Sequence, residues 1–197
     1  MLKRFFDITS SFIGLVLLAP LFIFIALWIK ITSVGPILFC QTRVGLNGKR
    51  FSIFKFRTMV VDAESKGLKV TVGRDPRITF CGHFLRRYKL DELPQLTNVL
   101  MGSMSVVGPR PEVPEYMDEY TDDVRKKILS VRPGITDKAS IEFTNEAEIL
   151  ASSSDPRASY INDIMPVKAK YYTEYVENYS FGTDILIILQ TLKKIIS

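Results

Sequence analysis

The sequence predicts a mixed α/β fold in which a compact, helix-rich domain with a small β-hairpin follows a re-entrant membrane helix. Residues 8–29 form a run of 22 residues without a charge. Residues 36–61 alternate between apolar and polar positions and are rich in β-formers, whereas helical patterns fill much of the remainder. A chain of 197 residues is long enough for one or two domains. We therefore divide it into a membrane hairpin at residues 1–32 and a cytosolic domain at residues 33–197.

The apolar run is the first element. As a helix it measures about 33 Å, which is just enough to cross a bilayer. Pro20 lies near its middle, where it removes a backbone hydrogen bond and bends the helix. Basic residues flank both ends of the run, so the positive-inside rule does not assign either end alone to the cytoplasmic side. We expect a re-entrant hairpin that bends at Pro20 and returns to its starting face. A plain membrane span is the open alternative, whereas a signal peptide is disfavoured because no small-residue cleavage pattern follows.

The elements after this run are predicted from turn, proline and periodicity signals. The β-hairpin turns at the sequence LNGK, residues 46–49. Pro94 suits the first turn of a helix that ends at Gly102. The tail at 184–197 is a basic amphipathic helix, which lies on a membrane or, as an equal alternative, packs on the core. The other segments are a polar stretch at 62–69, a loop at 73–77, helices at 82–89 and 115–131, and a proline-rich loop at 108–114. The helix with Pro94 in its first turn belongs to the segment at 90–101.

Charge and cysteine content narrow the class of protein. Two cysteines exclude a disulfide scaffold and favour a reducing compartment. Up to Arg110 the chain carries 16 basic residues against 6 acidic ones. A basic half of this kind indicates a phosphate-bearing partner, which is a nucleic acid, a nucleotide or an anionic lipid.

The strongest chemical candidate is the pair Asp91 and Glu92, which stands just before a predicted helix and close to Arg86. Adjacent carboxylates beside cations can hold Mg²⁺ and attack or position a phosphoryl group. The bland alternative is helix capping with surface ion pairs. Arg110 lies on a proline-rich loop, which suits a bidentate grip on phosphate. The further candidates at element ends are Lys55, Arg57, Arg43 and Arg77, each of which could equally be a solvated charge.

Five motifs occur in order along the chain: KFRTM at 55–59, DPR at 75–77, LDELPQ at 90–95, GSMSVVGPRP at 102–111 and RPGIT at 132–136. This set closely resembles the bacterial sugar transferases known as monotopic phosphoglycosyl transferases. The resemblance runs from the basic start at Lys3 and Arg4 to about Thr136, and the chain resembles the minimal catalytic core of the family. No single motif is decisive, but five in order are highly specific.

The resemblance implies transfer of a sugar-1-phosphate from a UDP-sugar to polyprenyl (undecaprenyl) phosphate, with release of UMP. This is the first membrane step of glycan assembly, on the cytoplasmic face of the bacterial inner membrane. The implied partners are the UDP-sugar donor, the polyprenyl phosphate acceptor and membrane lipid, with a second copy of the chain or downstream glycosyltransferases as further partners. No nucleic acid is expected. Pro20 matches the proline that breaks the family's re-entrant helix, although Ala19 replaces the serine found in many members.

The same resemblance assigns roles to the candidate residues. Asp91 is the nucleophile and forms a phosphosugar–aspartate intermediate. Glu92 assists deprotonation of the acceptor or coordinates the metal. The implied cofactor is Mg²⁺, held by Asp91 and Glu92. The implied phosphate ligands are Arg86 and Arg110, supported by Lys55, Arg57, Arg43 and Arg77.

The sequence departs from the commoner family pattern after Thr136. Asp137 replaces a glycine, Ser140 replaces a glutamine, and Thr144 stands where an arginine is usual. This region is expected to touch the nucleotide or the sugar. We therefore hypothesise a distinct donor, such as an acetamido or amino sugar.

Other functions stay open at this point. The chain could be a membrane-anchored, phosphate-binding adaptor of a glycan assembly complex without turnover, although the Asp91–Glu92 pair argues against pure phosphate binding. Nucleic-acid binding rests only on the basic half and leaves the apolar run unexplained. Within the enzyme hypothesis, the acceptor could instead attack the donor directly while the two carboxylates only bind Mg²⁺.

Overall fold

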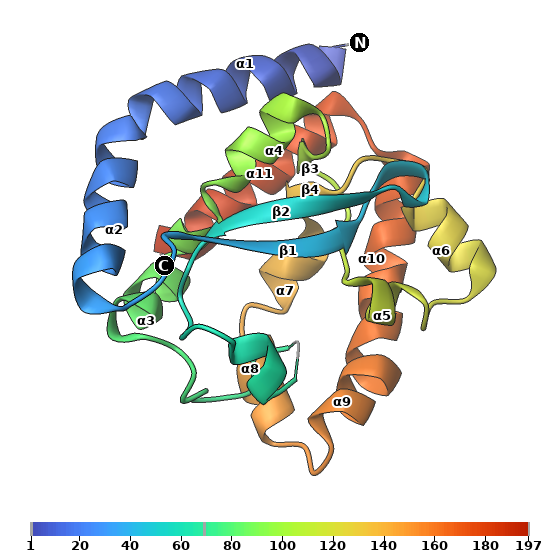
Figure 1. Ribbon diagram of the computed structural model, residues 1–197. Helices are drawn as coiled ribbons and strands as arrows, with labels where there is room; N and C mark the ends of the chain where they lie inside the picture. The colour runs from blue at the N-terminus through green and yellow to red at the C-terminus, as the bar shows by residue number, and fades with distance from the viewer. Residues whose placement is uncertain (1, 69, 197) are drawn as a thin grey trace.

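The computed structural model describes residues 2–68 and 70–196. Met1, Lys69 and Ser197, which stand at the ends of predicted segments, lie outside the described residues. Two helices, α1 (Leu2–Leu17) and α2 (Ala19–Thr32), frame one corner of the molecule in Figure 1. An antiparallel pair of strands, β1 (Leu38–Val44) and β2 (Arg50–Phe56), crosses its centre. The small sheet among many helices confirms the mixed α/β class.

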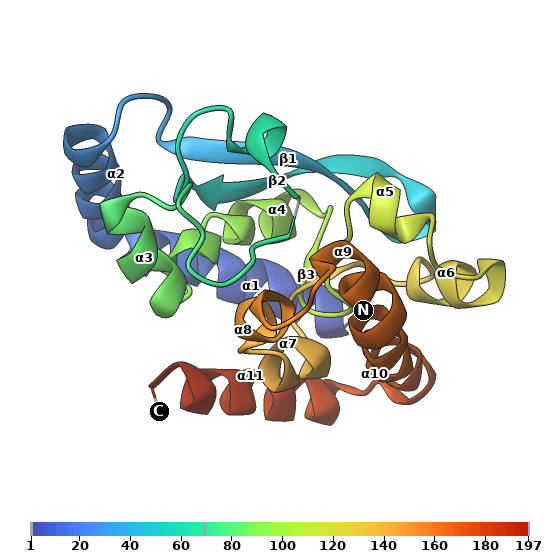
Figure 2. The ribbon, with the colours of Figure 1, turned by 90° about the horizontal axis from the view of Figure 1, so that it is seen from below.

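The remaining elements are mostly short helices. They are α3 (Phe80–Arg87), α4 (Gln95–Met101), α5 (Pro114–Met117), α6 (Asp122–Ile128), α7 (Lys138–Glu142), α8 (Glu146–Ala151), α9 (Pro156–Ser159), α10 (Met165–Asn178) and α11 (Phe181–Ile196), with strands β3 (Ser105–Val107) and β4 (Gly134–Thr136), 3₁₀ turns at Leu46–Gly48, Ala63–Lys66 and Leu90–Glu92, and a π-helical turn at Tyr160–Ile164. Figure 2 shows the hairpin on one side of α4 and α11 on the other, with α7 packed on α11.

The apolar run bends as expected. Helices α1 and α2 meet at Leu18 with an angle of 61°. The break precedes Pro20 by two residues because proline is tolerated in the first turn of a helix, whereas its ring would clash with the carbonyl of Val16 in a continuous one. Within the described residues, no single helix is both long enough and apolar enough to cross a bilayer. Helices α1 and α2 together meet both criteria, but they are bent relative to each other.

The hairpin is confirmed in position and turn. Its strands pair from Leu38 opposite Phe56 to Val44 opposite Arg50. Asn47 in the turn takes a positive φ of 55°, a conformation that asparagine tolerates better than most residues. The outer edge of β2 is covered by α4, because the Asn98 amide nitrogen donates to the Ser52 carbonyl at 2.8 Å and its side-chain oxygen accepts from the Phe54 amide at 2.9 Å.

Three helix predictions differ from the structure. The helix expected at 82–89 is α3, which begins at Phe80 and ends at Arg87. The helix expected at 115–131 is divided into α5 and α6, because Tyr120 turns into the core and Thr121 takes extended dihedrals before α6. The C-terminal helix begins at Phe181 rather than at residue 184. This helix packs on the core through Ile187, which is buried. Its Leu186, Leu189 and Leu192 side chains are more than half exposed.

The start of α1 forms an ion pair with the C-terminal helix α11 and lies beside α10. The Lys3 ammonium forms an ion pair with Asp184 of α11 at 2.6 Å and donates to the Val107 carbonyl at 3.0 Å. The Tyr175 hydroxyl of α10 donates to the same Asp184 at 2.7 Å. Helix α1 therefore packs on the body of the molecule, with α4 and β3 beneath it.

We expect Asp7→Ala to lower the free energy of unfolding by about 3 kcal/mol, because it leaves two buried donors without a partner. The Asp7 carboxylate is buried and accepts hydrogen bonds from the Ser105 hydroxyl and the Val106 amide, at 3.1 and 3.0 Å. Thermal unfolding in detergent checks this. The exposed Glu142→Ala should change stability by less than about 0.5 kcal/mol, and equal losses in both variants would contradict the role of Asp7.

Candidate active site

The loop that carries Arg110 is held by a close crossing of two backbone segments. The Gly134 amide donates to the Pro109 carbonyl at 3.0 Å, and the Gly108 amide donates to Thr136 at 3.1 Å. A Cβ on Gly134 would lie 2.1 Å from the Gly108 nitrogen, so only glycine fits there. This crossing at the ends of the parallel strands β3 and β4 explains why glycine and proline recur in both motifs. It directs Arg110 toward the hairpin.

The acidic pair is placed by a sharp turn after α3. Thr79 caps α3 by accepting a hydrogen bond from the Gly82 amide at 3.1 Å. At the other end of the helix, Lys89 takes a positive φ of 55°, which redirects the chain into the 3₁₀ turn. Asp91 and Glu92 lie in that turn and are 7% and 8% exposed. Both carboxylates are therefore buried, which contradicts the alternative that they form surface ion pairs.

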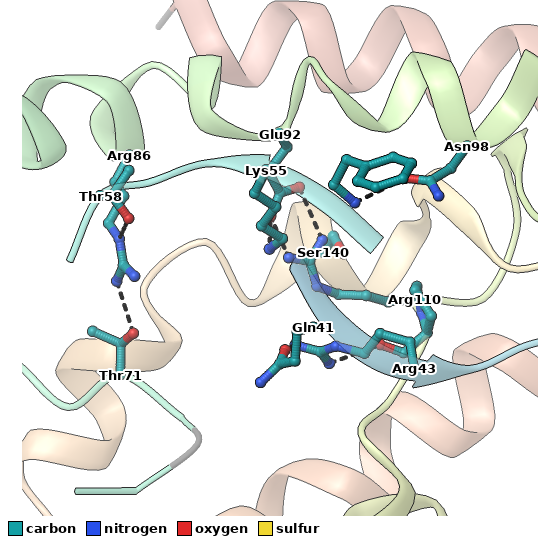
Figure 3. Close-up of polar contacts among 12 residues, drawn as sticks. Gln41, Arg43, Lys55, Thr58, Thr71, Arg86, Glu92, Asn98, Arg110 and Ser140 are labelled. Carbon is teal, nitrogen blue, oxygen red and sulfur yellow. Dashed lines mark hydrogen bonds and ion pairs between the residues drawn. The ribbon is translucent and has the colours of Figure 1, made fainter. Parts of the chain in front are cut away.

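Glu92 binds two cations from distant parts of the chain (Figure 3). Lys55 of β2 donates to its Oε1 at 2.8 Å. Arg110 donates to both carboxylate oxygens, with its Nη1 at 3.1 Å from Oε2 and its Nη2 bonded to Oε1. Hydrogen bonds to both oxygens of a carboxylate fix its orientation. The structure thus brings together three of the predicted residues.

Burial and charge shift the pKa values of this cluster in different directions. Burial lowers the pKa of Lys55 to about 8, against the opposing effect of Glu92. Burial alone would raise the pKa of Glu92, but Arg110 and Lys55 hold it well below its ordinary value. The charge of Glu92 in turn raises the pKa of Arg110. Glu92 is therefore a weak base that stays ionised.

Asp91 has the opposite character. Its carboxylate makes no hydrogen bond or ion pair with the described residues, although it lines the large cavity described below. Burial raises its pKa, and the neighbouring Glu92 charge raises it further. A carboxylate with a raised pKa and no protein partner is a better nucleophile and metal ligand than an ordinary aspartate.

Arg86 and Arg43 lie on the same cavity. Arg86 of α3 donates to the Thr58 and Thr71 hydroxyls, each at 2.8 Å (Figure 3). Arg43 of β1 donates to the Pro111 carbonyl at 2.9 Å and to the side chain of Gln41, and its buried Nε has no partner in the described part of the chain. Burial lowers the pKa of both guanidinium groups, which indicates sites that favour an added negative charge.

Arg57 and Arg77 are engaged elsewhere, although both border the cavity. The Arg57 guanidinium donates to the Ser33, Val34 and Pro36 carbonyls at 2.6–3.0 Å and so holds the link between α2 and β1. Arg77 forms a two-oxygen ion pair with Asp75 and also donates to two carbonyls in residues 63–68. Their expected support of phosphate binding stays a prediction, because these donors already have partners.

The site residues surround a cavity of about 1260 Å³. Its wall includes Ser140, Phe143, Thr144 and Asn145, which come from the segment where the sequence departs from the family pattern. Asp137 itself is buried and caps α7 by accepting a hydrogen bond from the Ser140 amide at 2.9 Å. Sequence reasoning missed five polar residues of the site and its scaffold: Asn98, Glu112, Glu146, Tyr160 and Lys168. Only the proline-rich motif beside Glu112 offered a signal.

The fit for a divalent cation is partial. No group of three His, Cys, Asp or Glu side chains within the described residues is arranged to hold a metal. Magnesium in phosphate chemistry, however, is often bound by one or two carboxylates together with the substrate's phosphates. Asp91 fits that pattern, because its oxygens are unpaired. Glu92 fits it less well, because Lys55 and Arg110 already bind both of its oxygens.

Comparison with known proteins finds one family along the whole chain. The family described as bacterial sugar transferase matches residues 1–197. An exopolysaccharide production protein, PSS, of Rhizobium leguminosarum bv. phaseoli is 40% identical over 206 residues, covering 97% of this chain and 93% of that protein.

Two longer relatives have more specific names. An undecaprenyl-phosphate glucose phosphotransferase of Komagataeibacter xylinus is 40% identical over 203 residues. A UDP-N-acetylgalactosamine-undecaprenyl-phosphate N-acetylgalactosaminephosphotransferase of Aeromonas hydrophila is 34% identical over 198 residues. The matches cover 98% and 100% of this chain but only 35% and 44% of those proteins. The sugars in the two names differ.

Proposed function

Because the chain belongs to the bacterial sugar transferase family, we propose that it transfers a sugar-1-phosphate from a UDP-sugar to undecaprenyl phosphate and releases UMP. One observation carries this proposal. Asp91 is a buried carboxylate that is unpaired among the described residues, and it lines a cavity whose walls also hold Lys55, Arg86 and Arg110. An unpaired nucleophile beside several cations is suited to attack on a diphosphate, because the cations offset the charge repulsion between carboxylate and phosphate.

The first half of the proposed reaction forms a covalent intermediate. An Asp91 oxygen attacks the phosphorus that carries the sugar. The new P–O bond to Asp91 forms as the bond from that phosphorus to the bridging oxygen breaks. UMP leaves with the bridging oxygen and its electron pair, and Arg86 and Arg110 offset the charge that develops on the phosphates.

In the second half, an oxygen of undecaprenyl phosphate attacks the same phosphorus and the bond to Asp91 breaks. One flank of the cavity suits an apolar acceptor, because Leu38, Val60 and Val61 line it and each is at least 40% exposed. Val61 lies against Gly35 in the segment that follows α2, since a Cβ on that glycine would come within 2.7 Å of its side chain. The acceptor therefore enters from the side of the apolar helices.

The proposed role of Glu92 is to position Lys55 and Arg110. Its lowered pKa makes it a poor proton acceptor, so the base role implied by the family resemblance is disfavoured. Mg²⁺, where bound, would neutralise the donor diphosphate and make UMP a better leaving group. Asp91 would hold it together with the donor's phosphates, and Glu92 would orient the surrounding cations.

The proposed location is the cytoplasmic face of the bacterial inner membrane, with residues 1–32 as a re-entrant anchor and residues 33–197 as the catalytic domain. Apolar side chains that are more than half exposed support this membrane contact. On α1 and α2 they include Phe5, Phe12, Leu17, Ile23, Phe24 and Leu27. Such an exposed apolar surface is unusual in a protein surrounded only by water. Assembly with a second copy or with downstream glycosyltransferases stays a prediction.

Isotope exchange tests the covalent mechanism. With a UDP-sugar but no acceptor, labelled UMP should enter the donor pool, because UMP can attack the aspartyl intermediate and regenerate the donor. Asp91→Asn should reduce this exchange by about a thousandfold or more, whereas the exposed Asp123→Asn should leave it unchanged. Product formation without exchange in the unaltered protein would favour direct attack by the acceptor, and absence of UMP release with every donor would favour the adaptor function.

Donor preference tests the proposal that an acetamido or amino sugar is transferred. Residues 140 and 143–147, in and after the divergent segment, line the cavity. We expect kcat/KM for UMP release to be about tenfold higher with UDP-N-acetylhexosamines than with UDP-glucose or UDP-galactose, because one hydrogen bond to the added group has that effect. A clear preference for either plain hexose would contradict this proposal.

Cysteine labelling distinguishes a re-entrant anchor from a plain span. In a background without Cys40 and Cys81, single cysteines replace Leu2 and Val34, which are 61% and 92% exposed. A membrane-impermeant maleimide should label both in inverted vesicles and neither in intact spheroplasts. Phe24→Cys, in the middle of α2, should resist labelling in both. Labelling of the position 2 cysteine in spheroplasts would indicate a plain span.

A further inference from the structure

A second group of polar side chains lines the cavity apart from the acidic pair and its cations. It consists of Glu112 in the proline-rich loop, Glu146 at the start of α8, Tyr160 in the π-helical turn and Lys168 in α10. The proposed transfer steps use none of them. A π-helical turn costs regular helical hydrogen bonding and occurs often at functional sites. We call these four residues the distal wall.

The distal wall is a connected network. The Lys168 ammonium, on a residue that is 4% exposed, forms an ion pair with Glu146 Oε2 and lies 4.9 Å from the centre of the Tyr160 ring. The Tyr160 hydroxyl donates to Glu112 at 2.9 Å. A lysine this deeply buried needs a carboxylate partner. Lys168 therefore fixes the position of the Glu146 side chain.

Glu146 remains open to a ligand. Its side chain is 26% exposed, and its second oxygen, Oε1, makes no hydrogen bond or ion pair with the described residues. The carboxylate borders the cavity. An ionised oxygen held in place by Lys168 is a strong acceptor for hydroxyl or amide donors. The same charge repels phosphate, which is attracted instead to the cations around Asp91.

We propose that Glu146, held by Lys168, recognises a sugar ring of the donor by accepting hydrogen bonds from its hydroxyl or amide groups. This inference rests on the proposed function and adds a specificity-determining residue to it. The donor has two such rings, the transferred sugar and the ribose of UMP. Each ring is joined directly to the diphosphate, and Glu146 lines the same cavity as Lys55, Arg86 and Arg110, among which we place the phosphates. Lys168 acts as a positioning residue.

Binding to a catalytically silent protein tests this proposal. In an Asp91→Asn background, dissociation constants are measured by calorimetry for UDP-N-acetylgalactosamine, UDP-glucose and UMP. Adding Glu146→Gln should weaken binding of the preferred UDP-sugar by about tenfold to a hundredfold, as expected for a hydrogen bond to a charged group. Glu142→Gln is the matched control, because Glu142 is exposed on α7 and lies away from the cavity wall. It should leave binding unchanged.

The ligands distinguish the two rings. If the transferred sugar is recognised, only UDP-sugar binding weakens; if the ribose is recognised, UMP binding weakens equally. Unchanged binding of all three ligands in the Glu146→Gln variant would overturn the proposal. If the unaltered protein bound no UDP-sugar and no UMP in the presence of Mg²⁺, the proposed function would be wrong instead.

Two further variants exclude a purely structural effect. Glu146→Gln leaves the Lys168 charge buried without its ion pair and could destabilise the fold, whereas adding Lys168→Met removes both charges. The double change should recover thermal stability but not UDP-sugar affinity. Lys168→Arg should keep most of the affinity, because arginine preserves the ion pair. Recovery of affinity together with stability in the double variant would show that the pair only holds α8 to α10, against the proposal.

Discussion

The double ion pair of Glu92 is the constraint on which the site depends. It joins β2, the 3₁₀ turn after α3 and the proline-rich loop at one buried carboxylate. Burying three charges is costly unless each has a partner in good geometry, and removal of any one leaves the others uncompensated. The three segments therefore have few alternative arrangements. Asp91, the next residue along the chain, is held in the cavity by the same arrangement.

The arginines of the motifs divide into two groups according to their surroundings. Arg57 and Arg77 use their guanidinium groups to hold chain segments, because carbonyls and Asp75 surround them. Arg86 and Arg43 bond neutral oxygens, and among the described residues neither has a carboxylate partner within hydrogen-bond distance. The same side chain thus serves as a structural clamp in one place and as a candidate anion ligand in another. Its neighbours, rather than its motif, decide which.

The cavity suits two ligands of opposite solubility. Apolar side chains beside the segment after α2 form one flank, and the charged distal wall on α8 and α10 forms another. Asp91 and the neighbouring cations line the same cavity. In the proposed reaction, a membrane-embedded acceptor and a water-soluble donor react at this one carboxylate. The exposed apolar faces of α1 and α2 would set the height of this cavity at the membrane surface.

The sequence by itself determined the local features: the hairpin turn at Asn47, the bend before Pro20 and the end of α4 at Gly102. It also identified Asp91 and Glu92, which line the cavity, as the candidate acidic pair. These signals act over a few residues, through backbone dihedrals and missing hydrogen bonds. Only the tertiary structure decided which charges meet. Glu92 binds partners 37 and 18 residues away, and the distal wall joins three segments: the proline-rich loop, α8, and the π-helical turn that continues into α10. Burial and ion pairing depend on which segments pack together, and no local pattern encodes that.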